Sequence, residues 1–155
     1  MLRAAADGDV SLLADIYAST RAEELQPVPW TDAQKKAFTD WQSQQQEAHY
    51  ALHYPAAERL VVEREGVGIG RLYIDTARTE VRLMDVTLLP PFRNQGIGTR
   101  LMDEVLAYAD ALRRPASLHV EPFNPAKRMY DRMDFAVTET RGLYEFMVRP
   151  VPGGA

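Results

Sequence analysis

The feature that most constrains the fold is a junction between an apolar segment and a helical pattern, built on two closely spaced glycines. Residues 83–89, LMDVTLL, have the apolar and β-branched character that favours a strand. After the junction, apolar residues recur at helical spacing from Ile97 to Leu112, which predicts a helix over 97–113. A further strand-like segment follows at 116–121. Since a strand, a helix and a second strand in this order form a right-handed crossover, we expect the two strands to be parallel.

The other segments alternate between strand and helix patterns. Thr31 and Gln34 match the capping box that starts a helix, and the tripeptide REG at 64–66 indicates a hairpin turn. The expected strands are 2–5, 58–65, 66–75, 80–89, 116–121, 135–139 and 143–149, and the expected helices are 11–19, 31–54, 97–113 and 124–133. Within the last helix, Asn124 is expected as N-cap and Pro125 at the first position. The sequence therefore predicts an α/β (α+β) fold with a mixed sheet.

Composition narrows the range of functions. Of the 155 residues, 46% are hydrophobic, which suits one domain, expected over 1–149, with a flexible tail over 150–155. The absence of cysteine excludes disulfides, thiolate metal sites and a cysteine nucleophile. A formal net charge of −4 argues against nucleic-acid binding. No apolar run approaches the roughly 20 residues that span a bilayer, and no apolar segment follows a basic start, so we expect a cytoplasmic protein without membrane contact.

The glycine junction has the properties of an anion site. A helix N-terminus carries unpaired backbone N–H groups and roughly half a unit of positive charge. Gly96 and Gly98 let the backbone approach a ligand closely, and Arg93 and Arg100 keep the region positive. Residues 86–102 contain no acidic side chain. These observations favour a phosphate or pyrophosphate, and the structural alternative is a tight turn without a ligand.

Two common nucleotide-binding patterns do not fit this junction. A Walker A loop requires a lysine that is missing here. A Rossmann fingerprint requires a third glycine or an alanine where Leu101 stands, and it would fall earlier in the chain. A phosphate-binding protein of another class, using the same helix terminus, remains an alternative.

The segment RNQGIG at 93–98 fits the [Q/R]-x-x-G-x-[G/A] pattern of the GNAT superfamily of N-acetyltransferases, which the chain resembles most closely over 80–135. The neighbouring segments agree, because an apolar strand ends in proline at VTLLP and NPAKRMYDRMDF is similar to the family's Asn…Ala…Tyr…Phe segment. The resemblance implies a mostly antiparallel sheet of six to seven strands, flanked by about four helices, with one parallel strand pair around an acetyl-CoA site.

The resemblance also implies acetyl-CoA as the co-substrate, and we expect no metal. In such enzymes the loop and the helix start hold the CoA pyrophosphate, while the preceding strand pairs with the pantetheine arm and polarises the thioester carbonyl through backbone N–H groups. Carried over to this sequence, the cofactor-binding residues are Val86, Thr87, Leu88, Arg93, Asn94, Gln95, Gly96, Ile97, Gly98, Thr99, Arg100 and Asn124. Asn124 stands six residues before Tyr130, where many members have seven, so it is either a ligand of CoA or only an N-cap.

Acetyl transfer to an amine requires a group that accepts the amine proton and a group that protonates the leaving thiolate. Tyr130 matches the usual acid of the family, although its place on an apolar helical stripe is also typical of a core tyrosine. Asp85 lies inside an apolar strand and is either paired with an arginine or a base. Glu121 alternates with His119 on one face of the next strand, and either side chain can act as a base. The predicted catalytic residues are Tyr130, Asp85 and Glu121.

The polar helix predicted over 31–54 contains two histidines that could belong to a metal site or to a pocket for the acceptor. His49 and His53 have the spacing of zinc ligands, but no third ligand accompanies them, so packing or an acceptor pocket is the better interpretation.

Two functions follow from the resemblance. One is an N-acetyltransferase in which a primary amine attacks acetyl-CoA directly in a ternary complex. The other is a non-catalytic module that binds CoA or acyl-CoA. Homodimers are common in the family.

Overall fold

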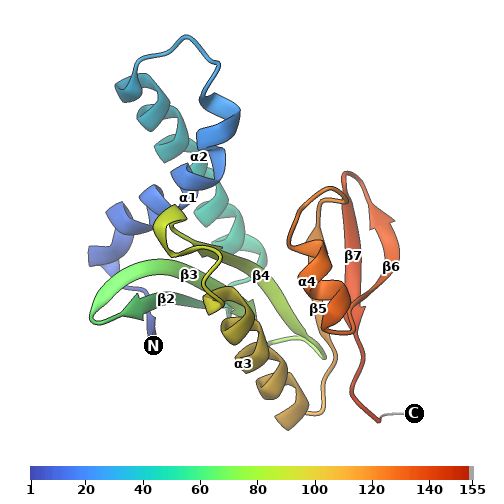
Figure 1. Ribbon diagram of the computed structural model, residues 1–155. Helices are drawn as coiled ribbons and strands as arrows, with labels where there is room; N and C mark the ends of the chain where they lie inside the picture. The colour runs from blue at the N-terminus through green and yellow to red at the C-terminus, as the bar shows by residue number, and fades with distance from the viewer. Residues whose placement is uncertain (154–155) are drawn as a thin grey trace.

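The computed structural model describes residues 1–153 and contains one seven-stranded sheet with the strand order β1-β2-β3-β4-β5-β7-β6 (Figure 1). The strands are β1 Leu2–Ala4, β2 Glu58–Arg64, β3 Val67–Asp75, β4 Val81–Leu88, β5 Ala116–Val120, β6 Ala136–Arg141 and β7 Tyr144–Arg149. Neighbouring strands are antiparallel except for the parallel pair β4–β5. This arrangement confirms the predicted mixed sheet and its single parallel pair.

Four α-helices cover the sheet. They are α1 Val10–Leu25, α2 Asp32–His53, α3 Ile97–Ala111 and α4 Lys127–Arg132, and two short 3-10 turns, Asp7–Asp9 and Pro90–Phe92, precede α1 and the glycine loop. One buried cluster joins α3 and α4 to one face of the sheet, and a second joins α1 to the other face. Thr31 caps α2 as predicted, since its hydroxyl accepts from the Gln34 N–H at 3.1 Å. No helix within residues 1–153 is both long enough and apolar enough to cross a membrane.

The sheet divides into two parts between β4 and β5. These strands pair over three residues only, and the last pair is Leu83 with Leu118. Beyond it, β4 stays paired with β3 as far as Leu88, while β5 stays paired with β7. Figure 1 shows β1–β4 with α1, α2 and α3 on one side and β5–β7 with α4 on the other. We call this divergence of β4 and β5, beyond Leu83 and Leu118, the fork.

The structure corrects the ends of two predicted helices, the start of a third, and the end of the strand predicted over 135–139, which reaches Arg141. The first helix is longer than predicted and reaches Leu25, and the third ends at Ala111, two residues earlier than predicted. The predicted start of the last helix at 124–125 is wrong, because α4 begins at Lys127. The Asn124 side chain accepts instead from the Ala126 N–H at 2.9 Å and so forms a turn ahead of the helix. Of the tail expected over 150–155, residues 154–155 lie outside the described residues.

Candidate functional site

The start of α3 presents a row of free backbone donors. Across the described residues, none of the N–H groups from Asn94 to Thr99 donates to the protein, and the first that does is Arg100, to the Gly96 carbonyl at 3.1 Å. Asn94 and Gly96 both have a positive φ, of 61° and 82°. These left-handed residues turn the chain sharply between β4 and the helix. The predicted cofactor-binding segment 94–99 therefore forms a continuous set of donors at a helix N-terminus, which is suited to an anion.

The two glycines of this loop serve different purposes. Gly96 caps α3 in a left-handed conformation that other residues adopt at a cost. Gly98 has no positive φ, and a methyl group built on it meets no atom within 4 Å. Neither backbone geometry nor internal packing therefore requires a glycine at 98. The space in front of Gly98 is the space that a ligand lying against the helix start would occupy.

Arg93 and Gln95 hold the loop in place through their side chains. The Arg93 Nε donates to the Leu88 carbonyl at 2.9 Å, and its guanidinium reaches the Ser19 hydroxyl at 3.3 Å. The Gln95 amide donates to the Pro91 carbonyl at 2.8 Å and accepts from Arg64 at 3.0 Å. These contacts fix the turn that directs the backbone donors outward. Arg100 is exposed one turn into α3, where it can supply positive charge beside them.

The strand segment that was predicted to contact pantetheine lies along the fork. Val86, Thr87 and Leu88 pair with β3 on one side, and within the described chain no strand pairs with their other edge. The register between β3 and β4 shifts next to Tyr73, where Met84 is the extra residue on β4. This bulge accompanies the divergence of β4 from β5. An extended chain lying in the fork would therefore meet free backbone groups of β4.

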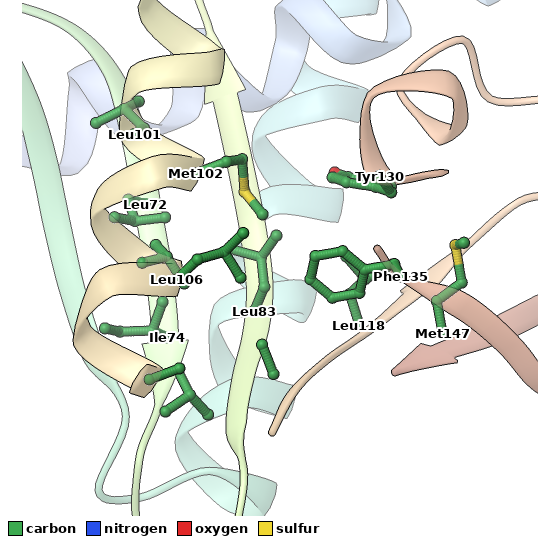
Figure 2. Packing of buried hydrophobic residues seen from close by; sticks show 14 of the residues in the cluster. Leu72, Ile74, Leu83, Leu101, Met102, Leu106, Leu118, Tyr130, Phe135 and Met147 are labelled. Atoms are coloured by element: carbon green, nitrogen blue, oxygen red, sulfur yellow. The ribbon is translucent and has the colours of Figure 1, made fainter. Parts of the chain in front are cut away.

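Tyr130 projects from α4 toward the fork. Its side chain is 7% exposed and packs edge to face against Phe135, with ring centroids 5.7 Å apart. In Figure 2 its ring lies between β5 and the α3–β4 side, with the hydroxyl toward β4. Burial, and in smaller part the charge of Asp85, raise the pKa of Tyr130 to about 12. The hydroxyl therefore stays protonated at neutral pH, as a proton donor must.

Asp85 is held in a charged network on the opposite face of the sheet. It forms an ion pair with Arg71, which is 1% exposed, and accepts from the Thr87 hydroxyl at 2.6 Å. Arg71 also donates to the Gln46 amide oxygen at 2.8 Å, and Glu47 lies 3.8 Å from its guanidinium. Burial is the largest single influence and lowers the pKa of Arg71, but Asp85, together with Tyr73 and Tyr50, outweighs it, so that the pKa is raised. Of the two sequence-based alternatives for Asp85, the structure shows the ion pair with an arginine.

His119 and Glu121 lie at the end of β5 that borders the fork. His119 is exposed while Leu118 and Val120 are buried, which confirms the predicted alternation. The His119 ring lies 3.2 Å from an Arg141 nitrogen, and partial burial together with Arg82 and Arg141 lowers its pKa. Glu121 follows the last residue of β5 and is partly exposed, and no hydrogen bond to its carboxylate occurs within residues 1–153.

A cavity of about 400 Å³ lies where β4 and β5 begin to diverge. His49, for which the sequence suggested packing or an acceptor pocket, lines it together with Tyr50 of α2 and Tyr54, which follows the last residue of α2. Arg82 of β4 and Tyr144 of β7 also line it and were missed. The rings of His49 and His53 are tilted by 47° to each other with 4.4 Å between their centroids, and no group of three metal-binding side chains exists in the described part of the chain.

The comparisons with known proteins agree with this geometry. The model of the acetyltransferase (GNAT) family matches residues 14–135, and no curated protein matches the chain. Among solved structures, the chain is similar to the PaiA N-acetyltransferase of Thermoplasma acidophilum in complex with coenzyme A. The identity is 14% and the TM-score 0.73, over 97% of this chain and 98% of that one.

Two further solved structures are similar. One is an acetyltransferase from Thermus thermophilus, at 17% identity and a TM-score of 0.68, over 97% of this chain and 96% of that one. The other is a GNAT family acetyltransferase from Brucella melitensis in complex with acetyl-CoA, at 18% identity and a TM-score of 0.60, over 99% and 88%. At identities this low, the structural similarity establishes a shared fold and nothing further. Because the family model covers most of the sequence, the chain belongs to the GNAT family of acetyltransferases.

Proposed function

We propose that the protein is an acetyl-CoA-dependent N-acetyltransferase that acetylates a primary amine in a ternary complex. The observation that carries this proposal is the row of free N–H groups from Asn94 to Thr99, directly beside the open edge of β4. The first feature suits the pyrophosphate of CoA, and the second suits its extended pantetheine arm. The CoA and acetyl-CoA bound in two of the similar structures support the same assignment.

The chemistry that we propose uses groups on both faces of the sheet at the fork. The amine nitrogen attacks the thioester carbonyl carbon, a C–N bond forms, and the C–S bond breaks. The backbone N–H of Val86 or of Leu88, each of which points away from β3, stabilises the oxyanion, and the Tyr130 hydroxyl gives its proton to the departing thiolate sulfur. The proton lost by the amine passes to a base on the acceptor side. No cysteine acyl-enzyme intermediate forms, because the sequence contains no cysteine.

The three candidate bases differ in their availability. Both oxygens of Asp85 are already engaged, by Arg71 and by Thr87, so we assign this carboxylate to holding β4 in shape. His119 lies on β5 and Glu121 follows its last residue, at the end of the strand that borders the fork, and neither is buried. We therefore propose that one of these two accepts the amine proton, directly or through water.

Replacing Gly98 with valine tests the CoA assignment, with alanine at the same position as the matched control. The family pattern allows alanine at this position, so Gly98→Ala should keep the binding of acetyl-CoA. It should also be more stable to urea by about 0.5–1 kcal/mol, because glycine is a poor helix former and the added methyl meets no protein atom outside its own helix. Gly98→Val should bind acetyl-CoA at least about tenfold more weakly by calorimetry, because its branched side chain fills the space in front of the helix start. Equally tight binding in the two variants would contradict the assignment.

A non-catalytic module that binds CoA is the second candidate, favoured by the engagement of Asp85. Release of CoA from acetyl-CoA, measured with and without added primary amines, separates the two. An N-acetyltransferase releases CoA only with an amine and forms one acetylated amine for each CoA. Tight binding of acetyl-CoA with no turnover across a broad amine panel would favour the module.

A further inference from the structure

The cavity beside the fork has a composition that restricts the acceptor. It lies between α2, the divergence of β4 and β5, and the start of β7. Two of its lining residues, Leu83 and Met84, stand where β4 leaves β5, so its inner end meets the position proposed for the thioester. Tyr130 belongs to the cluster on the other face of the sheet. A molecule in this cavity is thus placed to attack from the side opposite the proton donor.

Aromatic rings dominate the cavity wall. Five of its nine lining residues carry a ring, and they are His49, Tyr50, Tyr54, His119 and Tyr144. The rings come from α2 and the residue that follows it, from β5 and from β7, so they border the space from more than one element. Tyr50 packs edge to face against Tyr54 and Tyr73, at 6.3 Å and 5.8 Å between centroids, which fixes its orientation. Ring faces held in this way attract both apolar surface and an ammonium group.

The cavity offers little for additional charges on the acceptor. Arg82 is the one charged lining residue that the described structure provides, apart from the titratable histidines. All three of its nitrogens are engaged, by the Ser117 hydroxyl at 2.8 Å, the Glu80 carboxylate at 2.6 Å and the Tyr54 hydroxyl at 3.4 Å. Among the described residues, no carboxylate lines the cavity. A second ammonium group would therefore find no counter-ion there and would lie near a guanidinium.

From this wall and this charge distribution we infer that the acceptor is a monoamine with an aromatic or compact apolar body, and not a polyamine. The inference rests on the proposed N-acetyltransferase function and specifies its substrate class. The ammonium of the incoming amine binds against the tyrosine rings, and the body of the acceptor fills the remaining apolar space. A volume of about 400 Å³ accommodates one small ring system with its side chain.

Steady-state acetylation of 2-phenylethylamine and of spermidine, at saturating acetyl-CoA, tests this inference. We expect kcat/KM for 2-phenylethylamine to exceed that for spermidine by at least about tenfold. Tyr144→Ala should lower kcat/KM for 2-phenylethylamine at least about fivefold, mainly through KM, because it removes one ring of the cavity. The matched control is Tyr108→Ala on α3, since Tyr108 is 42% exposed against 45% for Tyr144 and lines no part of the cavity.

The outcomes separate this inference from the proposed function. Spermidine acetylated as well as or better than 2-phenylethylamine would overturn the inference and leave the N-acetyltransferase proposal intact. Equal effects of Tyr144→Ala and Tyr108→Ala would also overturn it. Failure to acetylate either amine or any other primary amine, with acetyl-CoA demonstrably bound, would overturn the proposed function and the inference with it.

Discussion

Replacing Tyr130 with phenylalanine is expected to lower kcat for amine acetylation by about 10²–10⁴-fold, the usual contribution of a general acid. Phenylalanine keeps the buried ring and its packing against Phe135, so the fold and the binding of acetyl-CoA should be retained. The thiolate must then leave without a positioned proton. The measurement is the rate of CoA release in the presence of a saturating amine, together with calorimetry of acetyl-CoA on the same variant.

The matched control for this variant is Tyr17→Phe. Tyr17 is a buried tyrosine at 5% exposure, on α1 and outside the cluster that contains Tyr130. It should keep the rate of the unaltered protein. If Tyr130→Phe bound acetyl-CoA and kept a similar rate, Tyr130 would have no part in the transfer, and the proposed acid would have to be sought elsewhere.

The pH dependence of the unaltered protein gives a second check on Tyr130. Its pKa of about 12 lies above the ordinary tyrosine value of about 10, so the folded protein holds the phenolic proton more tightly than the unfolded chain. The acid form is therefore complete at neutral pH and is lost only as the pH rises toward 12. The rate should rise with pH as the amine loses its proton and show no decline below about pH 10. A decline near pH 8–9 on the stable protein would contradict this assignment.

Replacing Arg71 with methionine is expected to destabilise the protein by about 3–5 kcal/mol. The guanidinium is 1% exposed and is the arginine partner of Asp85, and its removal leaves a mostly buried carboxylate with the Thr87 hydroxyl alone. Removing Arg71 affects Glu47 less, because Glu47 keeps its ion pair with Arg59, in which the nitrogen and the oxygen are 2.7 Å apart. Urea unfolding followed by circular dichroism measures the loss.

Two further variants show whether the loss comes from an uncompensated charge. The double variant Arg71→Met/Asp85→Leu should recover much of the stability, because it removes both charges and leaves apolar groups in their place. Arg59→Met removes an arginine that pairs with the same Glu47 but is 44% exposed, and it should cost at most about 1 kcal/mol. A double variant as unstable as the single one would mean that Asp85 is not the main partner of Arg71.

The parts of the fold that were predicted correctly depend on local sequence. The start of α2 follows from the hydrogen bonds between Thr31 and Gln34, and the start of α3 follows from a glycine that adopts a left-handed conformation. The crossover from β4 through α3 to β5 follows from chain connectivity. The start of the last helix was missed, because Asn124 forms a turn with Ala126 that competes with the helical cap.

The fork could not be predicted from residue patterns because it depends on a competition between strands. β5 pairs with β7 along its whole length but with β4 over only three residues, and nothing in the sequence of β5 shows which partner it keeps. The partner of Asp85 could have been predicted from the sequence. Arg71 stands inside the apolar strand segment GRLYI as Asp85 stands inside LMDVTLL, so two opposite charges in adjacent apolar strands signalled a pair. Nothing in the sequence indicated that the ring of Tyr144 would line the cavity.

Calorimetric titration of acetyl-CoA into the purified protein, and into Gly96→Glu, tests the central assignment most directly. The added carboxylate stands among the free N–H groups that would hold the pyrophosphate, so it should compete for them and repel the ligand. The control Gly142→Glu introduces the same charge at another open glycine with a positive φ, of 61° against 82° for Gly96. We predict binding at about micromolar Kd, kept in Gly142→Glu and abolished in Gly96→Glu. No binding to the unaltered protein would mean that the loop is only a turn, and the acetyltransferase assignment of this site would be wrong.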